Sequence, residues 1–429
     1  MSGGPTVARP PCSRRPALLA GLAALAAGAG CVSATSAYRE HVNALVEQDQ
    51  YAAALQAVEE QRVPKYGERD RVLYWLDKGA LLHMSRDYRD SDALLDQAEL
   101  RIDELYTKSL TQAAGTVLVN DATQDYAGEP HERALLYVLR ALNYAFAGKA
   151  DEAVVEARKV TAFLQLSGER VGMKAYRDDA FAHYLSAMLF EDAGRLDDAR
   201  ISRDAAERAY AGYAAAFRTP APQFGLPPRG PQDGELVVVQ YAGKVPIRGS
   251  KTTSVPVGRK LTVREMMQTN ADEQQASIPV AIPTIVMQPW RGRSATVTVD
   301  GRSSPTVRVE PISEITIKAL EDEMPAIKAR AAARAAAKGA GYGALQGAAP
   351  RVLSGAALSA MGASEQADTR SWFTLPAEIR MARVVVPAGV HDVVVTTADA
   401  QGAPVETRTL HGVRVSAGYR TWVHVRTAR

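Results

Sequence analysis

Two glutamates are the residues of this sequence whose type and setting come nearest to catalytic chemistry. Glu132 and Arg133 stand at the start of a predicted helix, and Glu156 and Arg158 lie on the helix that follows. Glycan-cleaving enzymes use such a pair of carboxylates, in which Glu156 would be the general acid beside Glu132. We favour the alternative, an ion-pair network that joins the two helices. Asn143, flanked by apolar residues, is expected to make a hydrogen bond between helices.

A second polar cluster, Asp368, Arg370 and Trp372, precedes the last predicted strands. Arginine and tryptophan are enriched at the centres of binding interfaces, so this cluster is a candidate contact site. The structural alternative, which we favour, is an Asp–Arg pair with a packed tryptophan at the entrance to a sheet. Both clusters are therefore predicted to have a structural or a binding role, and neither is predicted to be catalytic.

Other signatures of catalysis, metal binding and cofactor binding are absent from the sequence. The seven histidines are scattered, without an HExxH motif, and no calcium-binding loop is present. The stretch Gly339–Gly343 superficially suggests a dinucleotide-binding loop, but no strand precedes it. The 51 basic and 48 acidic residues leave a net charge of +3, which predicts no strong attraction to nucleic acid. We therefore predict no metal, no cofactor, no nucleic-acid partner and no enzymatic activity, with a glycan hydrolase as the alternative.

The first thirty residues have the three-part build of a secretory signal. Arg9, Arg14 and Arg15 form a basic start, and the uncharged stretch Ala17–Gly30 has the length of the apolar part of such a signal. A helix that spans a bilayer needs about 20 residues, so we expect residues 1–30 to be removed as a lipoprotein signal peptide. The Arg14-Arg15 pair also resembles a twin-arginine signal, which leaves the export route open.

Cys31 is the predicted site of lipid attachment. The small residues Gly28-Ala29-Gly30 directly before it resemble a lipobox, although glycine stands at 28 where leucine is usual. The thiol would accept diacylglycerol; an ordinary cut after Ala34 or Ala37, which discards the cysteine, is the alternative. Val32, in place of an aspartate, favours the outer membrane. We predict a protein anchored in the outer membrane by its N-terminal lipid and facing the periplasm, with a soluble periplasmic protein as the alternative.

Residues 31–217 are predicted to form a helical-repeat domain, because apolar residues recur at spacings of three and four. The segment Tyr74–Gly79 followed by Tyr88 carries the Trp, Gly and Tyr of a tetratricopeptide repeat, and Gly148 and Gly194 mark turns in further, degenerate copies. A plain α-helical bundle is the alternative. By the repeat register, the concave face that would bind protein partners is lined by Leu76, Ala80, His83, Met84, Val138, Leu142 and Phe146.

After the helical domain the sequence changes to β patterns. Prolines and glycines in 218–234 predict an extended linker. Short runs rich in Val, Ile and Thr predict strands within 235–316, at 236–241, 280–287, 295–299 and 306–310, and within 364–429, at 381–386, 390–397, 405–415 and 419–425. In the last run Trp422, His424 and Arg426 alternate with valines, which is typical of a half-buried strand, and Asp300-Gly301 predicts a hairpin turn. Residues 317–363 are predicted as a helix followed by a Gly- and Ala-rich arm. The predicted fold class is α+β, with a helical-repeat domain followed by a β-sandwich-like domain that carries a helical insertion.

Two groups of residues carry a resemblance to a known family. The first group comprises Leu118–Asp121, Tyr126, Gly128-Glu129, Glu132-Arg133, Leu142–Tyr144 and Val155–Arg158. The second comprises Ala367–Trp372, Leu375-Pro376 and Pro387–Gly389. In this order they resemble a family of poorly characterised bacterial outer-membrane lipoproteins with tetratricopeptide-like helices and a C-terminal β-rich region.

The resemblance implies a place in the cell envelope and no established biochemical activity. Members of the family are often encoded beside envelope lipoproteins of the curli-secretion and peptidoglycan-synthase-activator type. We therefore predict a scaffold that binds envelope proteins, other lipoproteins included, through its helical repeats. A regulator of a periplasmic enzyme such as a peptidoglycan synthase is the alternative, which rests on this genetic neighbourhood alone.

Overall fold

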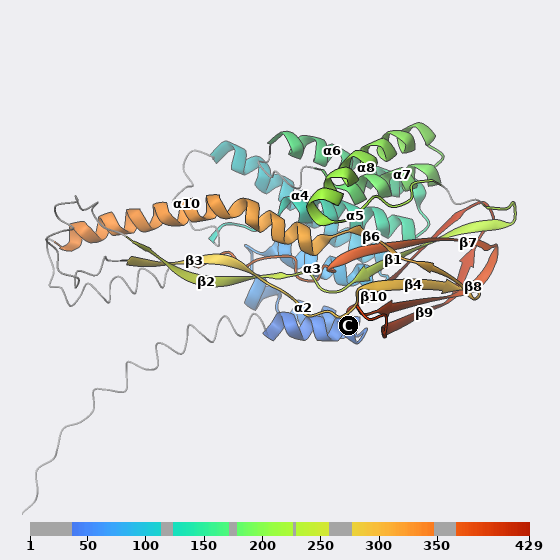
Figure 1. Ribbon diagram of the computed structural model, residues 1–429. Coiled ribbons are helices and arrows are strands. Elements are labelled where there is room, and N and C mark those ends of the chain that lie inside the picture. Colours follow the sequence, from blue (N-terminus) through green and yellow to red (C-terminus); the bar gives the residue numbers. More distant parts are fainter. Residues whose placement is uncertain (1–36, 113–122, 171–177, 226–228, 257–276, 347–365) are drawn as a thin grey trace, which may run out of the picture.

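The computed structural model describes residues 37–112, 123–170, 178–225, 229–256, 277–346 and 366–429. The predicted signal peptide, Cys31, the 118–121 segment of the family resemblance and residues 347–363 of the predicted arm lie outside these described residues. The chain has a mixed α+β fold, with helices in its N-terminal half and sheets in its C-terminal part (Figure 1).

The N-terminal half is a series of helices, and from α2 to α8 each helix packs against the next one along the chain. The series comprises a helix over 37–47, α2 (Tyr51–Glu60), the π-helical turn η1 (Arg62–Tyr66), α3 (Arg71–Met84), α4 (Tyr88–Gln112), α5 (Pro130–Phe146), α6 (Ala150–Arg170), α7 (Ala180–Asp192) and α8 (Leu196–Phe217). Gly79 permits the close approach of α3 and α4, because a Cβ atom there would lie 2.8 Å from Leu95 Cδ2.

The C-terminal part forms two four-stranded sheets and a two-stranded ribbon among the described residues. The first sheet has the order β10-β1-β7-β6, the second has the order β5-β4-β8-β9, and the ribbon pairs β2 with β3. The strands are β1 (Asp233–Ala242), β2 (Ile247–Pro256), β3 (Ser277–Val286), β4 (Ser294–Val299), β5 (Arg302–Pro305), β6 (Val307–Glu310), β7 (Glu378–Pro387), β8 (Gly389–Ala398), β9 (Pro404–Val415) and β10 (Arg420–Thr427). Asp300 and Gly301 join β4 to β5 with φ angles of 49° and 75°, which confirms the predicted hairpin turn.

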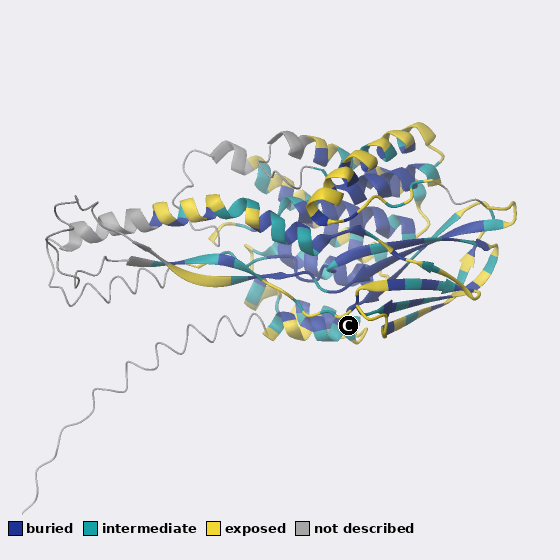
Figure 2. Cartoon of the chain, in the orientation of Figure 1, coloured by how far each residue is buried: buried dark blue, intermediate teal, exposed yellow. Residues whose placement is uncertain are grey.

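The first sheet is buried on both faces, and the molecule therefore has three layers. On β1, Val237, Val239 and Tyr241 belong to the core shared with the helices, whereas Leu236 and Val238 belong to the core between the two sheets. Figure 2 shows this double burial as a dark blue first sheet. A strand covered on both faces needs an unbroken apolar run, which Leu236–Val239 supplies.

The helical and β parts share one hydrophobic core, so the predicted separation into two domains by a linker is wrong. Part of the predicted linker, 218–234, is held against the protein. Thr219 is fully buried, and Arg383 on β7 donates a hydrogen bond to the carbonyl oxygen of Gly225 at 3.0 Å. The segment connects two layers of one structure.

Helix α10 (Ile312–Gln346) begins earlier than the helix predicted at 317 and continues through Pro325. It packs on β3, and Figure 1 shows the helix and the β2–β3 ribbon extending side by side from the rest of the protein. At the base of the ribbon, Arg248 Nη2 lies 2.8 Å from Glu129 Oε1 just before α5. None of the helices within the described part of the chain combines the length and the apolar character needed to cross a membrane.

Candidate functional site

The inner face of the helices is covered by the first sheet of the same chain. The residues predicted to line a partner-binding groove are fully or partly buried there, namely Leu76, Ala80, His83, Met84, Val138, Leu142 and Phe146. Tyr241 on β1 places its hydroxyl 2.6 Å from His83 Nε2, and the ring of His424 on β10 lies 4.8 Å from the ring of Phe146. The prediction that this face binds a separate protein is wrong, because the face is part of the core.

Asn143 makes the hydrogen bonds between helices that we expected of it. Its Oδ1 lies 2.7 Å from His83 Nδ1 on α3, and its Nδ2 donates to Ser91 Oγ on α4 at 3.0 Å. Burial lowers the pKa of His83 to about 4, so the ring is neutral at pH 7. Since Asn143 Oδ1 is an acceptor, His83 Nδ1 carries the proton and Nε2 accepts from the Tyr241 hydroxyl.

Glu132 joins the helices to the segment before β7. Its Oε1 accepts a hydrogen bond from the backbone N–H of Trp372 at 2.8 Å. Its Oε2 accepts from the backbone N–H of Glu129 at 2.9 Å and from the Tyr126 hydroxyl at 2.5 Å. Both oxygens are thus occupied by donors of the chain itself, and the residue is only 3% exposed.

Glu156 belongs to a different cluster, centred on Arg140. Its Oε1 lies 3.4 Å from Arg140 Nη2, and Arg140 Nε also donates to Asp92 Oδ1 at 2.8 Å. Arg140 follows Glu132 by eight positions on α5, which is a rise of about 12 Å. The two glutamates are therefore held in separate places by separate partners.

Arg133 and Arg158 contact other acidic residues. Arg133 Nη2 lies 3.1 Å from Asp103 Oδ1, and Arg158 Nη2 lies 3.4 Å from Asp198 Oδ2. The two arginines therefore do not pair with the two glutamates. An ion-pair network nevertheless joins the two helices, as predicted, because Arg140 on α5 pairs with Glu156 on α6.

Arg370 pairs with Asp368 and with a residue of the helical part. Its Nη2 lies 2.7 Å from Asp368 Oδ2, and its Nη1 lies 2.8 Å from Asp70 Oδ1 at the start of α3. Trp372 is 1% exposed, and its Nε1 donates to Thr374 Oγ1 at 3.0 Å. This cluster fastens the segment before β7 to the helices, as the structural alternative for it predicted.

Asp77 on α3 is a fully buried carboxylate against the same segment. Its Oδ2 accepts from the Tyr66 hydroxyl at 2.9 Å, and its Oδ1 accepts from Thr374 Oγ1 at 3.0 Å. Burial raises the pKa of Asp77 to about 7. The two hydrogen bonds and the charge of Arg39 lower this pKa, but burial has the larger effect.

This pKa predicts a pH-dependent stability that Asp77→Asn removes. Because the folded protein keeps the proton up to about pH 7 and the unfolded chain loses it near the ordinary value of 3.8, the free energy of unfolding falls as the pH rises between these values. One pKa unit corresponds to about 1.4 kcal/mol, so we expect an effect of at least that size. Urea unfolding at pH 5 and at pH 8 measures it, and an equal pH dependence of the variant and the wild type would refute the assignment.

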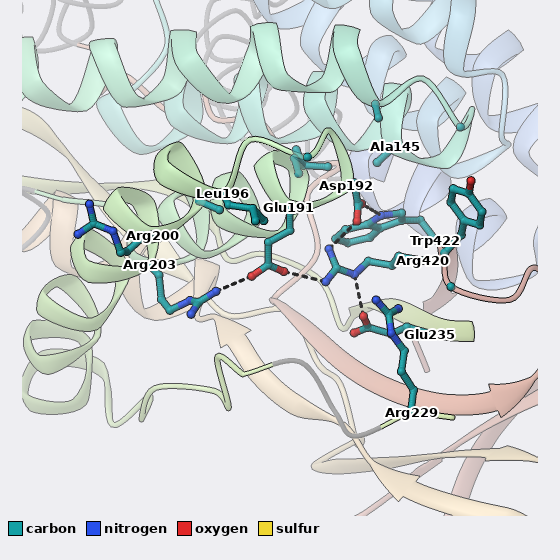
Figure 3. A pocket seen from close by; sticks show the side chains of 17 residues that line it. Ala145, Glu191, Asp192, Leu196, Arg200, Arg203, Arg229, Glu235, Arg420 and Trp422 are labelled. Carbon is teal, nitrogen blue, oxygen red and sulfur yellow. Dashed lines mark hydrogen bonds and ion pairs between the residues drawn. The ribbon is translucent and has the colours of Figure 1, made fainter. Parts of the chain in front are cut away.

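A cleft of about 810 Å³ lies where the turn between α7 and α8 meets β1 and β10 (Figure 3). This volume is within the range of about 300–1,000 Å³ typical of ligand sites. The lining includes Gly194 and Leu196 at the helix turn and Tyr419 and Trp422 in and just before β10. Two layers of the protein therefore contribute to one concave surface.

The floor of the cleft is fixed by Arg420. Its guanidinium contacts three carboxylates, Glu191 at 2.9 Å, Asp192 at 2.7 Å and Glu235 at 3.1 Å. Asp192 Oδ2 also accepts from Trp422 Nε1 at 2.7 Å. Burial raises the pKa of Asp192 to about 6 against the opposing charge of Arg420. Figure 3 shows these contacts in series across the floor.

The rim carries exposed side chains of two kinds. Arg200 and Arg229 are exposed and form no ion pair within the described part of the chain, whereas Arg203 is held by Glu191 at 2.5 Å. Leu196 is 70% exposed and Tyr419 is 72% exposed. The cleft thus offers unpaired positive charge beside apolar surface.

The sequence analysis missed this cleft, although it predicted both elements that form it. The turn at Gly194 and the strand that begins near Tyr419 were identified separately. The signal in the sequence was the charge at their ends, Glu191-Asp192 before the turn and Arg420 at the start of the strand. Nothing in their spacing shows that residues 229 positions apart form an ion pair.

Comparisons with known proteins leave the family open. No family model matches the chain, and no curated protein or solved structure matches it. Within the described residues, no group of three or more His, Cys, Asp or Glu side chains is placed to hold a metal ion.

Proposed function

We propose that this protein is a binding scaffold of the bacterial envelope and that it recognises a partner protein through the cleft beside Arg420. The observation that supports this best is the combination of a fixed floor with exposed arginine and apolar side chains at the rim. A preorganised site of this kind needs little reordering when it binds, which favours affinity. The inner face of the helices is not used, because the chain's own sheet covers it.

The chemistry of the rim selects the kind of segment that binds. Arg200 and Arg229 suit carboxylates, which guanidinium groups bind through paired hydrogen bonds. Leu196 and Tyr419 suit an apolar side chain, and aromatic residues contribute strongly at interface centres. We infer that the occupant is an exposed segment of an envelope protein that has acidic residues next to an apolar one.

The helices themselves support the tetratricopeptide-like hypothesis. In the turn from α5 to α6, Gly148 has φ 71°, and in the turn from α7 to α8, Gly194 has φ 69°. Both glycines stand at positions that the repeat register assigns to turns, and Gly79 stands at a close helix contact. We infer a set of degenerate repeats that presents the α7–α8 turn to the cleft.

The location of the protein is part of the proposal. We infer that Cys31 carries lipid and that the protein is held at the periplasmic face of the outer membrane. The lipobox-like residues before Cys31 and the valine after it support this assignment.

Reversal of the rim charge tests the function. We expect the double variant Arg200→Glu, Arg229→Glu to recover at least about tenfold less partner than the wild type, because like charges across an interface cost several kcal/mol. The measurement is quantitative mass spectrometry of proteins that co-purify with the full-length protein from detergent-solubilised envelopes.

A matched control separates this effect from general electrostatics. Arg208→Glu changes the charge of another exposed position on α8 that does not line the cleft. We expect this variant to recover the partner as the wild type does. Unchanged recovery by the double variant, with its unfolding midpoint preserved, would show that the cleft is not the binding surface.

A further inference from the structure

A second cavity lies further along β10, near its C-terminal end, and holds a buried arginine without a counter-ion. It has a volume of about 320 Å³ and lies among the turn before α2, the turn between α3 and α4, β9 and β10. Arg426 lines this cavity and is 6% exposed. Its Nη1 donates to the backbone oxygens of Tyr241 and Thr427, but its Nε has no hydrogen-bond partner. No carboxylate of the described residues pairs with it.

A buried guanidinium without a partner is costly, because the charge has lost its hydration and gained no opposite charge in return. Burial lowers the pKa of Arg426 to about 10 and outweighs the influence of Tyr51, Glu406 and Glu47, which raise it. Glu406 is itself engaged by Arg408, whose Nη2 lies 2.6 Å from its Oε1. The carboxylate of Glu406 is therefore already paired.

Two further side chains of the lining, His424 and Arg86, have no polar partner among the described residues. His424 lines the cavity, and neither ring nitrogen has a hydrogen-bond partner although the residue is 3% exposed. Arg86, at the turn between α3 and α4, is exposed and forms no ion pair within the described residues. Asp49 is the acidic residue of the lining, and it pairs with Arg408. The cavity has a surplus of unpaired positive charge.

We propose that this cavity is a binding site for a small anion, a phosphate or carboxylate group, with Arg426 as its buried counter-ion and Arg86 closing it from the surface. A guanidinium binds either group through charge-assisted hydrogen bonds. The neutral ring of His424 can donate one further hydrogen bond. The site is separate from the cleft of the proposed function, so either can fail without the other.

Calorimetric titration of the full-length protein in detergent, in a buffer of low chloride, tests the site with two probes. Inorganic phosphate and succinate are titrated separately at pH 7. We expect saturable binding of one anion per chain for at least one probe. Binding of phosphate alone identifies a phosphate site, and binding of succinate alone identifies a carboxylate site. Binding of both probes identifies a site for either group. Absence of saturable binding for both probes at millimolar concentration overturns the proposal.

Variants locate the binding. Arg426→Gln is expected to weaken anion binding at least about tenfold. Because this variant lacks the unpaired buried charge, its unfolding midpoint without anion should be no lower than that of the wild type. Arg86→Ala, at an exposed turn, is expected to weaken binding severalfold and serves if Arg426→Gln does not fold. Arg414→Gln, an exposed position of β9 outside the lining, is the control and is expected to bind normally. Wild-type affinity in both Arg426→Gln and Arg86→Ala overturns the proposal.

Discussion

Replacement of Arg420 by methionine is expected to lower the free energy of unfolding by about 3 kcal/mol. The arginine side chain is 3% exposed and contacts Glu235, whose side chain is 1% exposed. Removal of one partner of a buried ion pair leaves the other charge without water and without compensation. Methionine has a similar length, so the loss reports the charge more than the packing. Urea unfolding followed by far-ultraviolet circular dichroism measures it.

The expected loss in the free energy of unfolding lies at the lower end of the range for broken buried ion pairs, because the acidic partners of Arg420 keep other contacts. Glu235 retains Arg383, whose Nε lies 2.5 Å from its Oε1, and Asp192 retains Trp422. Arg203→Met is the matched control in the same cleft, since that side chain is 35% exposed and such pairs contribute about 0–1 kcal/mol. Equal, small losses for the two variants would mean that Arg420 does not fix the floor of the cleft.

Substitution of Cys31 by alanine is expected to move the protein from the membrane fraction to the soluble periplasmic fraction. Each buried CH2 group of an acyl chain contributes about 0.8 kcal/mol to membrane binding, and stable anchoring needs more than one chain. The loss of all chains should therefore reduce the membrane-bound fraction about tenfold or more. Fractionation of cells followed by immunoblotting measures the change.

The mass of the mature N-terminus distinguishes lipid attachment from an ordinary cut. An acylated Cys31 as the first residue is the expected result in the wild type. An unmodified N-terminus at Thr35 or Tyr38 corresponds to the cuts after Ala34 or Ala37 and would contradict the anchor. In that case Cys31→Ala would also leave the distribution of the protein unchanged.

Local patterns predicted the elements of this fold, and long-range contacts decided what the elements do. The apolar run of β1 and the Asp300-Gly301 turn were visible in the sequence because their signals are local. The pairing of β1 with β10 joins residues 185 positions apart, and no local signal indicates it. Strand β2 was missed because Gly249 and its polar residues weaken the apolar alternation.

The same limit explains the error about the helical face. Leu76 and Val138 were identified correctly as one side of the helices, but the sequence does not show what covers that side. Trp422, His424 and Arg426 were interpreted as one side of a half-buried strand. In the structure they face the helices, while Val425 on the other side of β10 packs between the sheets, so both sides are covered.

Site-specific photo-crosslinking in cells tests the central claim most directly, namely that the cleft beside Arg420 binds a partner protein. A photoreactive phenylalanine replaces Tyr419 at the rim or, as the control, Val390, which is 60% exposed on the second sheet. We expect a discrete adduct from position 419 that falls at least about tenfold when Arg200→Glu and Arg229→Glu are added. An adduct of equal yield from position 390, or one at 419 that the charge reversal leaves unchanged, would contradict the claim.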